Sequence, residues 1–177
     1  MKIEKVEAGQ VLRARARLLA RKVERPAAQD TSLELLEFGL AQERYALEHR
    51  WVQEVFPLKE LTPLPHTPPF IRGIVNLRGR ILPVFDLKRF FDFPEKGLTD
   101  LHRIILVRAN DLELGLLADY VVGMRSIPAE SLQASLPTLT GIGSDYLKGV
   151  TAERLIVLDL PRILADPKII VNDEVSV

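Results

Sequence analysis

The sequence predicts a mainly β protein made of two copies of one small, barrel-like unit. The first observation is an internal repeat, in which Phe70-Ile71-Arg72-Gly73-Ile74 is answered 76 residues later by Tyr146-Leu147-Lys148-Gly149-Val150. Further on, Asp86-Leu87 is answered 73 residues later by Asp159-Leu160, which fits one longer turn in the second copy. The second observation is a series of short apolar strands separated by turns, which is typical of small barrels.

The composition is that of an ordinary globular protein and excludes several classes of function. The chain has 177 residues, 47% of them hydrophobic and 27% charged, and its formal net charge of zero attracts neither nucleic acid nor anionic lipid. It contains no cysteine, which excludes disulfides, thiolate metal sites and cysteine nucleophiles. No apolar run approaches the roughly 20 residues of a membrane span, and Met1-Lys2-Ile3-Glu4 lacks the apolar segment of a signal peptide. We therefore expect a cytoplasmic protein without direct membrane insertion.

The first 30 residues are predicted to form a basic helical extension and a linker. Residues 1–29 carry eight Lys/Arg and three Asp/Glu, a balance of +5. Val11 to Glu24 favours a helix, because it has no Gly or Pro and its apolar residues recur every three or four positions. Three arginines, Arg13, Arg17 and Arg21, form a basic stripe beside that apolar stripe. Three uses stay open: packing on its own domain, docking to a partner or self-association, and binding to nucleic acid or a membrane surface.

The first copy of the repeat is expected to contain two hairpins. Leu33 to Leu40 and Tyr45 to Leu47 alternate with period two around a polar turn. Trp51 to Val55 continues the extended chain, and the four prolines between Thr62 and Pro69 preclude a regular element. Gly73 to Arg78 and Arg80 to Phe85 form the second hairpin around Gly79. Because Pro83 cannot donate to a ladder, its strand is expected at an edge or a bulge.

The second copy repeats this order of strands. Each of the two copies is expected to end with a short helix. Strands are expected at Leu101 to Val107, Leu112 to Leu117, Asp119 to Met124 and Leu155 to Leu158. Asp86 and Asp159 each precede a short helix, and their carboxylates can accept hydrogen bonds from its first free amides. The two aspartates are therefore interpreted as caps and not as catalytic residues.

The sequence shows no pattern of an active site. The histidines, His49, His66 and His102, are scattered, and none has the i, i+4 spacing of a zinc-binding helix. No serine follows a nucleophile-elbow pattern, and no glycine-rich loop links a strand to a helix as a phosphate site requires. We expect a protein that is not an enzyme and needs no cofactor or metal.

Residues 70–87 closely resemble the signature of the CheW family of chemotaxis adaptors. The similarity extends over roughly residues 33–165. It includes Tyr45 and Val52-Gln53-Glu54-Val55 upstream, and Leu114-Gly115, Asp119 with Val121, and Tyr146-Leu147-Lys148-Gly149 to Asp159 downstream. The same fold occurs in the regulatory domain of CheA kinases and in CheV proteins. This chain has no motif for a kinase or receiver domain, so the stand-alone adaptor fits best.

The resemblance implies two intertwined five-stranded SH3-like β-barrels over residues 31–167, followed by a tail at 168–177. It further implies an adaptor without activity of its own, which bridges the cytoplasmic tip of chemoreceptors to the regulatory domain of the histidine kinase CheA. Receptor binding carries over to Val52, Glu54, Val55, Asn76 and Arg78. The kinase-facing surface is placed near Arg103, Gly115 and Gly149. No nucleic-acid partner is expected, and the N-terminal helix is a candidate for self-association.

The chemistry of these residues fits a division into a receptor-binding surface and a kinase-facing surface. A receptor tip is an amphipathic helical hairpin, so its site should combine an apolar trough, supplied by Val52 and Val55, with a few fixed polar contacts. Arg78, at the end of a tight turn, can offer a planar fork to a carboxylate or to helix-end carbonyls. The alternative is that Arg78 is a solvated turn residue. Gly149 is interpreted as a site of close backbone packing. In a second interpretation the same module uses its basic helix as a tether to another protein, to nucleic acid or to lipid in a non-flagellar pathway.

Overall fold

The computed structural model describes residues 32–94, 97–99, 101–133 and 144–169. The chain divides between Asp30 and Thr31 into two units, and all the described residues belong to the second. The helix expected at Val11 to Glu24 and most of the tail at 168–177 therefore lie outside the described residues. The domain boundaries expected from the sequence stay a prediction.

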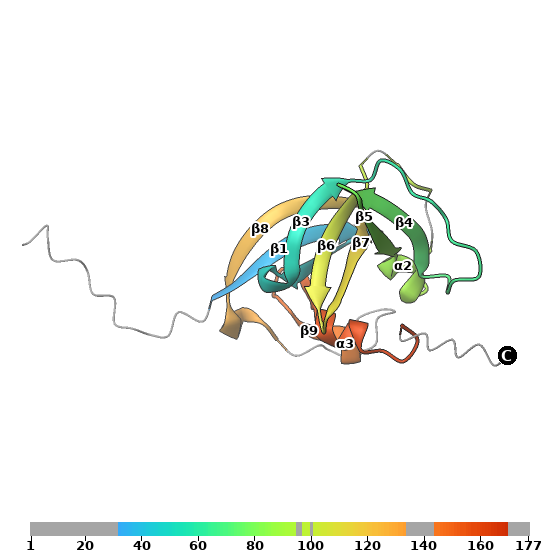
Figure 1. Cartoon of the computed structure of the whole chain (residues 1–177). Helices are drawn as coiled ribbons and strands as arrows, with labels where there is room; N and C mark the ends of the chain where they lie inside the picture. Colours follow the sequence, from blue (N-terminus) through green and yellow to red (C-terminus); the bar gives the residue numbers. More distant parts are fainter. Residues whose placement is uncertain (1–31, 95–96, 100, 134–143, 170–177) are drawn as a thin grey trace, which may run out of the picture. The chain divides into compact units, whose positions relative to one another are not determined.

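Two five-stranded sheets make up the described unit (Figure 1). Sheet A has the strand order β8-β1-β2-β10-β9 and sheet B the order β3-β6-β7-β5-β4. The strands of sheet A are β1 (Ser32–Leu40), β2 (Glu43–Glu48), β8 (Tyr120–Pro128), β9 (Leu147–Val150) and β10 (Ile156–Leu158). The strands of sheet B are β3 (Val52–Pro57), β4 (Ile71–Leu77), β5 (Arg80–Phe85), β6 (Arg103–Ala109) and β7 (Leu112–Ala118).

The helices are short and lie at the ends of strands. They are η1 (His49–Trp51), α2 (Leu87–Phe90), η2 (Ala129–Ser131), η3 (Ser144–Tyr146) and α3 (Leu160–Leu164). None of the helices among the described residues is long and apolar enough to cross a membrane. The prediction of a mainly β fold with short helices is confirmed.

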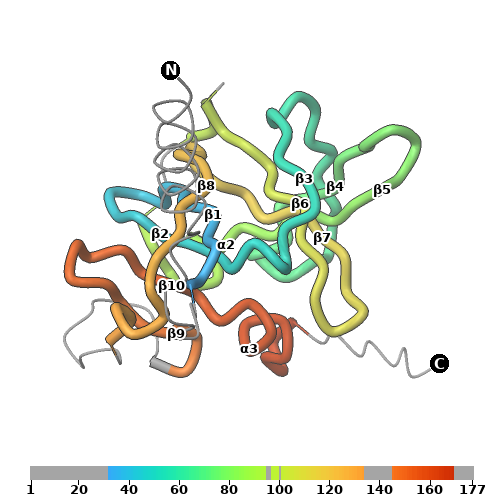
Figure 2. Tube along the Cα trace, turned by 90° about the vertical axis from the view of Figure 1, so that its left-hand side faces the viewer, coloured from blue at the N-terminus to red at the C-terminus, as the bar shows by residue number. Residues whose placement is uncertain are grey.

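The two sheets have one topology, and each combines a hairpin from one half of the chain with three strands from the other half. In each sheet an antiparallel hairpin, β1–β2 or β6–β7, pairs in parallel with the second strand of another hairpin. The chain crosses over after each first hairpin: β3, β4 and β5 join sheet B, and β8, β9 and β10 join sheet A. Figure 2 accordingly shows late β10 beside early β2. The intertwined arrangement is confirmed, but the described strand pairings leave each five-stranded sheet open and do not close a barrel.

The repeat read from the sequence is visible in matching hydrogen bonds. The Asp86 amide donates to the Phe70 carbonyl at 2.7 Å, and the Asp159 amide donates to the Tyr146 carbonyl at 2.9 Å. The side chain of Asp86 accepts from the Lys88 amide and begins α2, and that of Asp159 accepts from the Arg162 amide and begins α3. Both aspartates are caps, as the sequence predicts, because each satisfies a helix amide that has no partner within its helix.

The edge position predicted for Pro83 is wrong, since β5 lies between β7 and β4. The bulge of the β4–β5 pairing falls between Ile71 and Gly73, next to Pro83's partner and not at Pro83 itself. Pro83 is opposite Ile74 in β4, whose amide and carbonyl both bond to Thr62 on the other side. The parallel pairing with β7 covers only Val84 and Phe85. No ladder bond is therefore required of the Pro83 nitrogen, and an interior strand tolerates it.

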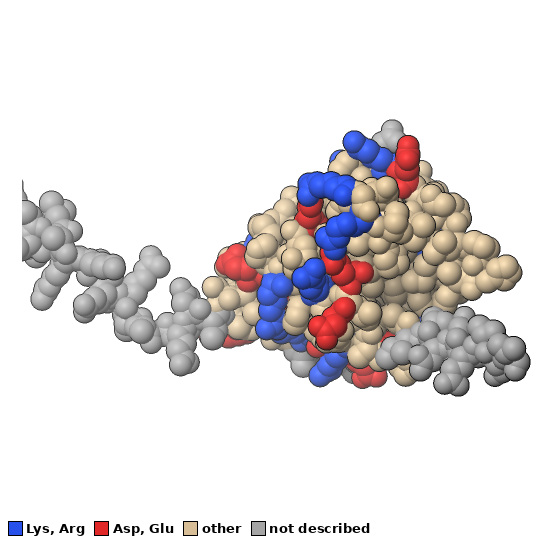
Figure 3. All heavy atoms as spheres, in the orientation of Figure 1, with Lys and Arg blue, Asp and Glu red and all other residues tan. Residues whose placement is uncertain are grey.

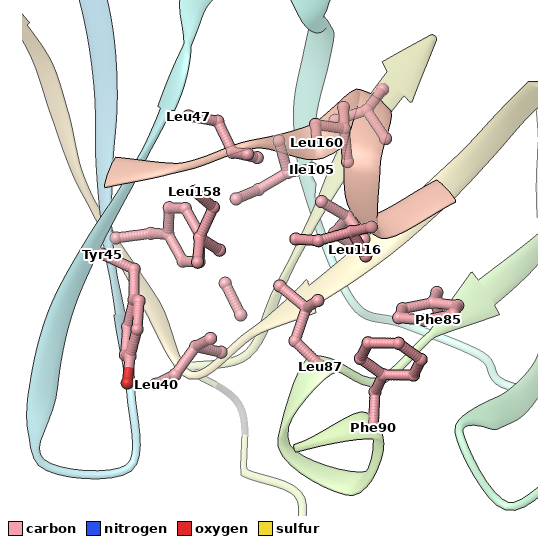
Figure 4. Close-up of a cluster of buried hydrophobic side chains, with 14 of the residues drawn as sticks. Leu40, Tyr45, Leu47, Phe85, Leu87, Phe90, Ile105, Leu116, Leu158 and Leu160 are labelled. Carbon is pink, nitrogen blue, oxygen red and sulfur yellow. The ribbon is translucent and has the colours of Figure 1, made fainter. Parts of the chain in front are cut away.

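One large core joins the two sheets, and each sheet also has a smaller cluster of its own. In the large core, side chains from both sheets and both α-helices point toward one another (Figure 4); those labelled include Tyr45, Leu116 and Leu160. Sheet B buries Val75, Leu82, Val84, Ile104, Leu106 and Leu117, with Phe56 and Leu77 packed against them. Sheet A buries Leu35, Ala46, Ile127, Leu155 and Val157.

Sheet A contains a network of ion pairs around one buried carboxylate, that of Glu37. Glu37, whose side chain is 5% exposed, accepts from Arg44 at 3.1 Å and from Arg125 at 3.4 Å. Arg125 also pairs with Glu153 in the turn after β9, and Arg44 donates to the Glu153 carbonyl at 3.1 Å. The network thus ties β1, β2 and β8 to the β9–β10 turn.

Candidate functional site

A groove lies between β3 and β4, the two edge strands of sheet B. Its volume is about 460 Å³. It is lined by Glu54, Phe56, Pro57, Lys59, Glu60, Val75, Asn76, Leu77 and Arg78. Because the edges of β3 and β4 are not paired with each other in the described sheet, the groove is the open seam of sheet B.

The seam is bridged by an ion pair. The guanidinium of Arg78, in the β4–β5 turn, donates to both carboxylate oxygens of Glu54 in β3, at 2.6 and 3.1 Å. This two-bond geometry matches a planar fork to a carboxylate. The side chains are 75% and 32% exposed, respectively, so the pair contributes about 1 kcal/mol or less to stability. Its main structural effect is to fix where the guanidinium sits above the groove.

The turn that carries Arg78 has a left-handed backbone. Arg78 has φ of 52° and Gly79 has φ of 84°, the combination found in type I′ hairpin turns. The side-chain oxygen of Asn76 accepts a hydrogen bond from the Gly79 amide at 2.8 Å and closes the turn from the side. Glycine and asparagine are preferred in such turns, so an arginine there is uncommon.

The floor of the groove is apolar and its rim is charged. Phe56, Val75 and Leu77 belong to the cluster of sheet B, and Val75 is buried. Lys59 and Glu60, which follow β3, add one charge of each sign to the rim. An apolar floor with a few fixed polar groups is the usual design of a site for another protein's side chains.

The structure brings together three of the five residues predicted to bind a receptor. Glu54, Asn76 and Arg78 line the groove. Val52 and Val55 are not among its lining residues, because both are half-buried and pack against the large core. The apolar trough that was expected from the two valines is supplied in the groove by Phe56, Val75 and Leu77.

The residues predicted to face a kinase do not converge on one side-chain cluster. Arg103 begins β6 and donates to the carbonyls of Leu101 and His102. Gly115 is buried within sheet B, where an added Cβ would lie 2.5 Å from Cγ2 of Ile104. Gly149 is buried in sheet A, and an added Cβ would lie 2.7 Å from the Gln133 carbonyl oxygen. Both glycines permit close packing, and the kinase surface itself stays a prediction.

Sequence reasoning missed two sets of residues. The first is the rest of the groove, Phe56, Pro57, Lys59, Glu60, Val75 and Leu77. Phe56, Val75 and Leu77 are direct sequence neighbours of the residues predicted to bind a receptor. The second is an apolar strip on edge strand β8, formed by Tyr120, Val122 and Met124, which are 41%, 58% and 51% exposed. Their alternation in the strand is a signal, but every residue from 120 to 124 is apolar or glycine, so the sequence alone does not show which face is exposed.

The charges near the groove are mixed in sign. Figure 3 shows a band of basic and acidic side chains over β3 and β6, and neither sign dominates on this face. Arg108 and Arg80 both donate hydrogen bonds to Glu113 and hold the pKa of that carboxyl below its usual value. A face of this kind favours paired polar contacts with a protein over binding to a polyanion.

Comparison with known proteins gives the family. The model of the CheW-like domain matches residues 34–168. The chain is 28% identical over 150 residues to the chemotaxis protein CheW of Treponema pallidum, with 81% of this chain and 88% of that protein covered. It is 29% identical over 159 residues to CheW of Klebsiella aerogenes, covering 87% and 95%. It is also 35% identical over 114 residues to protein FrzA of Myxococcus xanthus, covering 64% and 70%.

A solved structure agrees with these relatives. The scaffolding protein TtCheW of Thermoanaerobacter tengcongensis has a TM-score of 0.69 and 32% sequence identity to this chain, with 78% of this chain and 96% of that chain covered. The basic residues before position 30 fall outside the matched family model. Since the family model spans both sheets and the structural match covers the same fold, the chain belongs to the CheW-like family and is a non-enzymatic chemotaxis adaptor.

Proposed function

We propose that this adaptor couples the cytoplasmic tip of chemoreceptors to the regulatory domain of a CheA-type histidine kinase in membrane-associated arrays. The observation that carries the proposal is the groove of sheet B, where Glu54, Asn76 and Arg78 surround an apolar floor on a scaffold of the CheW-like family. A helical hairpin offers apolar side chains at intervals of three or four residues and polar groups beside them, which matches this arrangement.

Arg78 makes the polar contact in this proposal. Its side chain is 75% exposed although its guanidinium is held by Glu54, so the remaining N–H groups are available to a partner carboxylate or carbonyl. A hydrogen bond to a charged group contributes about 1.5–3 kcal/mol, which corresponds to roughly ten- to a hundredfold in affinity.

In this proposal, apolar side chains outside the groove extend the receptor surface. Val52 and Val55 are half-buried on β3, and the strip of Tyr120, Val122 and Met124 is exposed on β8. An exposed apolar strip on an edge strand is unusual for a protein that acts alone, because such edges promote association. Its presence supports a partner that covers it.

The kinase side is assigned to the surface around Arg103, Gly115 and Gly149. The two buried glycines act there through packing, because each lets a neighbouring side chain, Ile104 or Leu132, approach the backbone. Arg103 is the one charged side chain of the three, and it is half-buried at the start of β6. Arg103 lies opposite Pro57 of the groove in the β3–β6 pairing, so this end of the proposed kinase surface adjoins the groove.

A charge-swap series tests the receptor site. The variants are Arg78→Glu, Glu54→Arg and the double variant, with Arg108→Glu as a matched control. Arg108 is also an exposed arginine paired to a glutamate, Glu113 at 2.9 Å, but it does not line the groove. Binding to a receptor-tip hairpin and kinase activation in a reconstituted receptor–adaptor–kinase mixture are measured for each folded variant.

We expect Arg78→Glu to weaken receptor binding by about tenfold or more, while Arg108→Glu binds as the wild type does. The double variant restores the ion pair across the seam but presents the opposite charge to the partner, so its binding should stay weak. Recovery of binding in the double variant would show that Arg78 serves only to hold the seam, and the receptor assignment would then fail.

A further inference from the structure

Asn76 holds the turn from which Arg78 projects. Its side-chain oxygen accepts from the Gly79 amide at 2.8 Å, across a turn in which Arg78 and Gly79 both have positive φ. Asn76 itself is exposed and lies opposite Ile81 in the β4–β5 hairpin. Its oxygen is therefore directed at the backbone of its own turn, and its NH2 group is the donor that it can offer to a partner.

The turn needs such support because of the residue that it carries. An L-residue with a long side chain, such as arginine, is unfavourable in the left-handed region, where glycine and asparagine are tolerated. Two restraints keep Arg78 there: the Asn76–Gly79 hydrogen bond fixes the backbone, and the two bonds to Glu54 fix the guanidinium. The fork is thus ordered before any partner arrives.

We infer that Asn76 is a positioning residue, which acts on the receptor through Arg78 and does not contact it. This inference rests on the proposed function, because it requires Arg78 to contact the receptor tip. Its physical basis is preorganisation: a side chain that is already fixed loses less conformational freedom on binding. Without the bond from Asn76, the turn would populate other backbone conformations and Arg78 would be presented only part of the time.

Two substitutions separate positioning from contact. Asn76→Asp keeps the acceptor for the Gly79 amide but removes the NH2 donor that a direct contact would use. Asn76→Ala removes both. Because aspartate also adds a negative charge beside Arg78, the comparison is repeated at low and high salt, which screens exposed charges.

The experiment uses the full chain and a chemoreceptor signalling-tip hairpin on a trimeric coiled coil. Hydrogen exchange of the Gly79 amide is measured by NMR in the free protein, and tip affinity is measured by calorimetry for each Asn76 variant, with Arg78 present and with Arg78→Ala. We expect Asn76→Ala to speed Gly79 exchange and to weaken binding by about two- to tenfold, the range for one hydrogen bond. Asn76→Asp should keep the Gly79 exchange rate and the tip affinity within about twofold of the wild-type values. In the Arg78→Ala background, Asn76→Ala should cause no further loss.

Each other outcome overturns the inference. Equal loss from Asn76→Asp and Asn76→Ala would indicate direct contact through the NH2 group. An undiminished effect of Asn76→Ala in the Arg78→Ala background would show that Asn76 does not act through Arg78. Unchanged Gly79 exchange would show that the turn does not need the bond. Wild-type protein that binds no receptor tip would instead refute the proposed function, and this role of Asn76 with it.

Discussion

The buried ion pair of Glu37 and Arg125 can be replaced by the apolar pair that sheet B uses in the same place. Glu37 lies opposite Gly123 beside a bulge in β8, and Leu106 lies opposite Glu54 beside a bulge in β3. These matching registers place Glu37 in correspondence with Leu106, and Arg125 with Phe56. Leu106 and Phe56 pack in the cluster of sheet B. We predict that Glu37→Leu with Arg125→Phe yields a stably folded protein.

The expected loss of stability in each single variant depends on which charged groups remain without their partner. Arg125→Phe leaves Glu37, 5% exposed, with Arg44 alone, and the loss of one charged hydrogen bond costs about 2 kcal/mol. Glu37→Leu leaves Arg44 and Arg125, which are 44% and 32% exposed and reach water, so we expect a cost of about 1 kcal/mol. The double variant removes the buried carboxylate and buries apolar surface instead, so it should lie within about 1 kcal/mol of wild type.

Urea unfolding followed by circular dichroism measures the three free energies of unfolding, and equal m-values confirm that the same surface is exposed in each variant. The expected coupling between the two substitutions is about 2 kcal/mol. Glu153→Gln is the control for the exposed half of the network and should cost less than about 1 kcal/mol. A double variant destabilised by the full sum of the singles would refute the correspondence between the two sheets.

Two further predictions test packing and titration. Tyr146 donates to Asp166 and holds the pKa of that carboxyl below its usual value, while the same bond raises the pKa of Tyr146. A depressed folded pKa stabilises the protein above the unfolded pKa and stops doing so as pH falls through the folded one. The difference in Tm between wild type and Tyr146→Phe should therefore be constant near neutral pH and shrink as the pH falls below about 4; a constant difference down to about pH 2 would contradict this. Gly149→Ala should destabilise the fold more than Gly115→Ala does, because its Cβ meets backbone and not only a side chain. For both variants, kinase binding per folded molecule should stay unchanged, and a loss of binding without a loss of stability would contradict the packing role.

Local features of the fold could be predicted from the sequence because they depend on neighbouring residues. The caps at Asp86 and Asp159 need only a carboxylate ahead of a short helix, and the structure has both. The β4–β5 hairpin needs only alternating residues and Gly79 in its turn. The repeat was visible because both halves satisfy the same backbone hydrogen bonds, such as those of Asp86 with Phe70 and Asp159 with Tyr146.

The groove could be predicted only in part. Glu54 and Arg78 were identified through a resemblance to a family, but their ion pair joins residues 24 positions apart in the chain. Val52 and Val55 lie close to Glu54 in sequence, and yet they pack against the large core. Which way a side chain faces on a twisted, bulged edge strand depends on the strands beside it, and the bulge at Gln53 changes that direction.

The sequence by itself determined the strand pattern, the two capped helices and the presence of two related halves, since these depend on short-range periodicity and backbone chemistry. Only the tertiary structure decided that each sheet combines a hairpin of one half with three strands of the other, that Pro83 lies in an interior strand, and that Glu37 is buried against two arginines. These features arise from pairing between distant segments. Such pairing is set by the joint burial of both sheets in one core and not by any local preference of the chain.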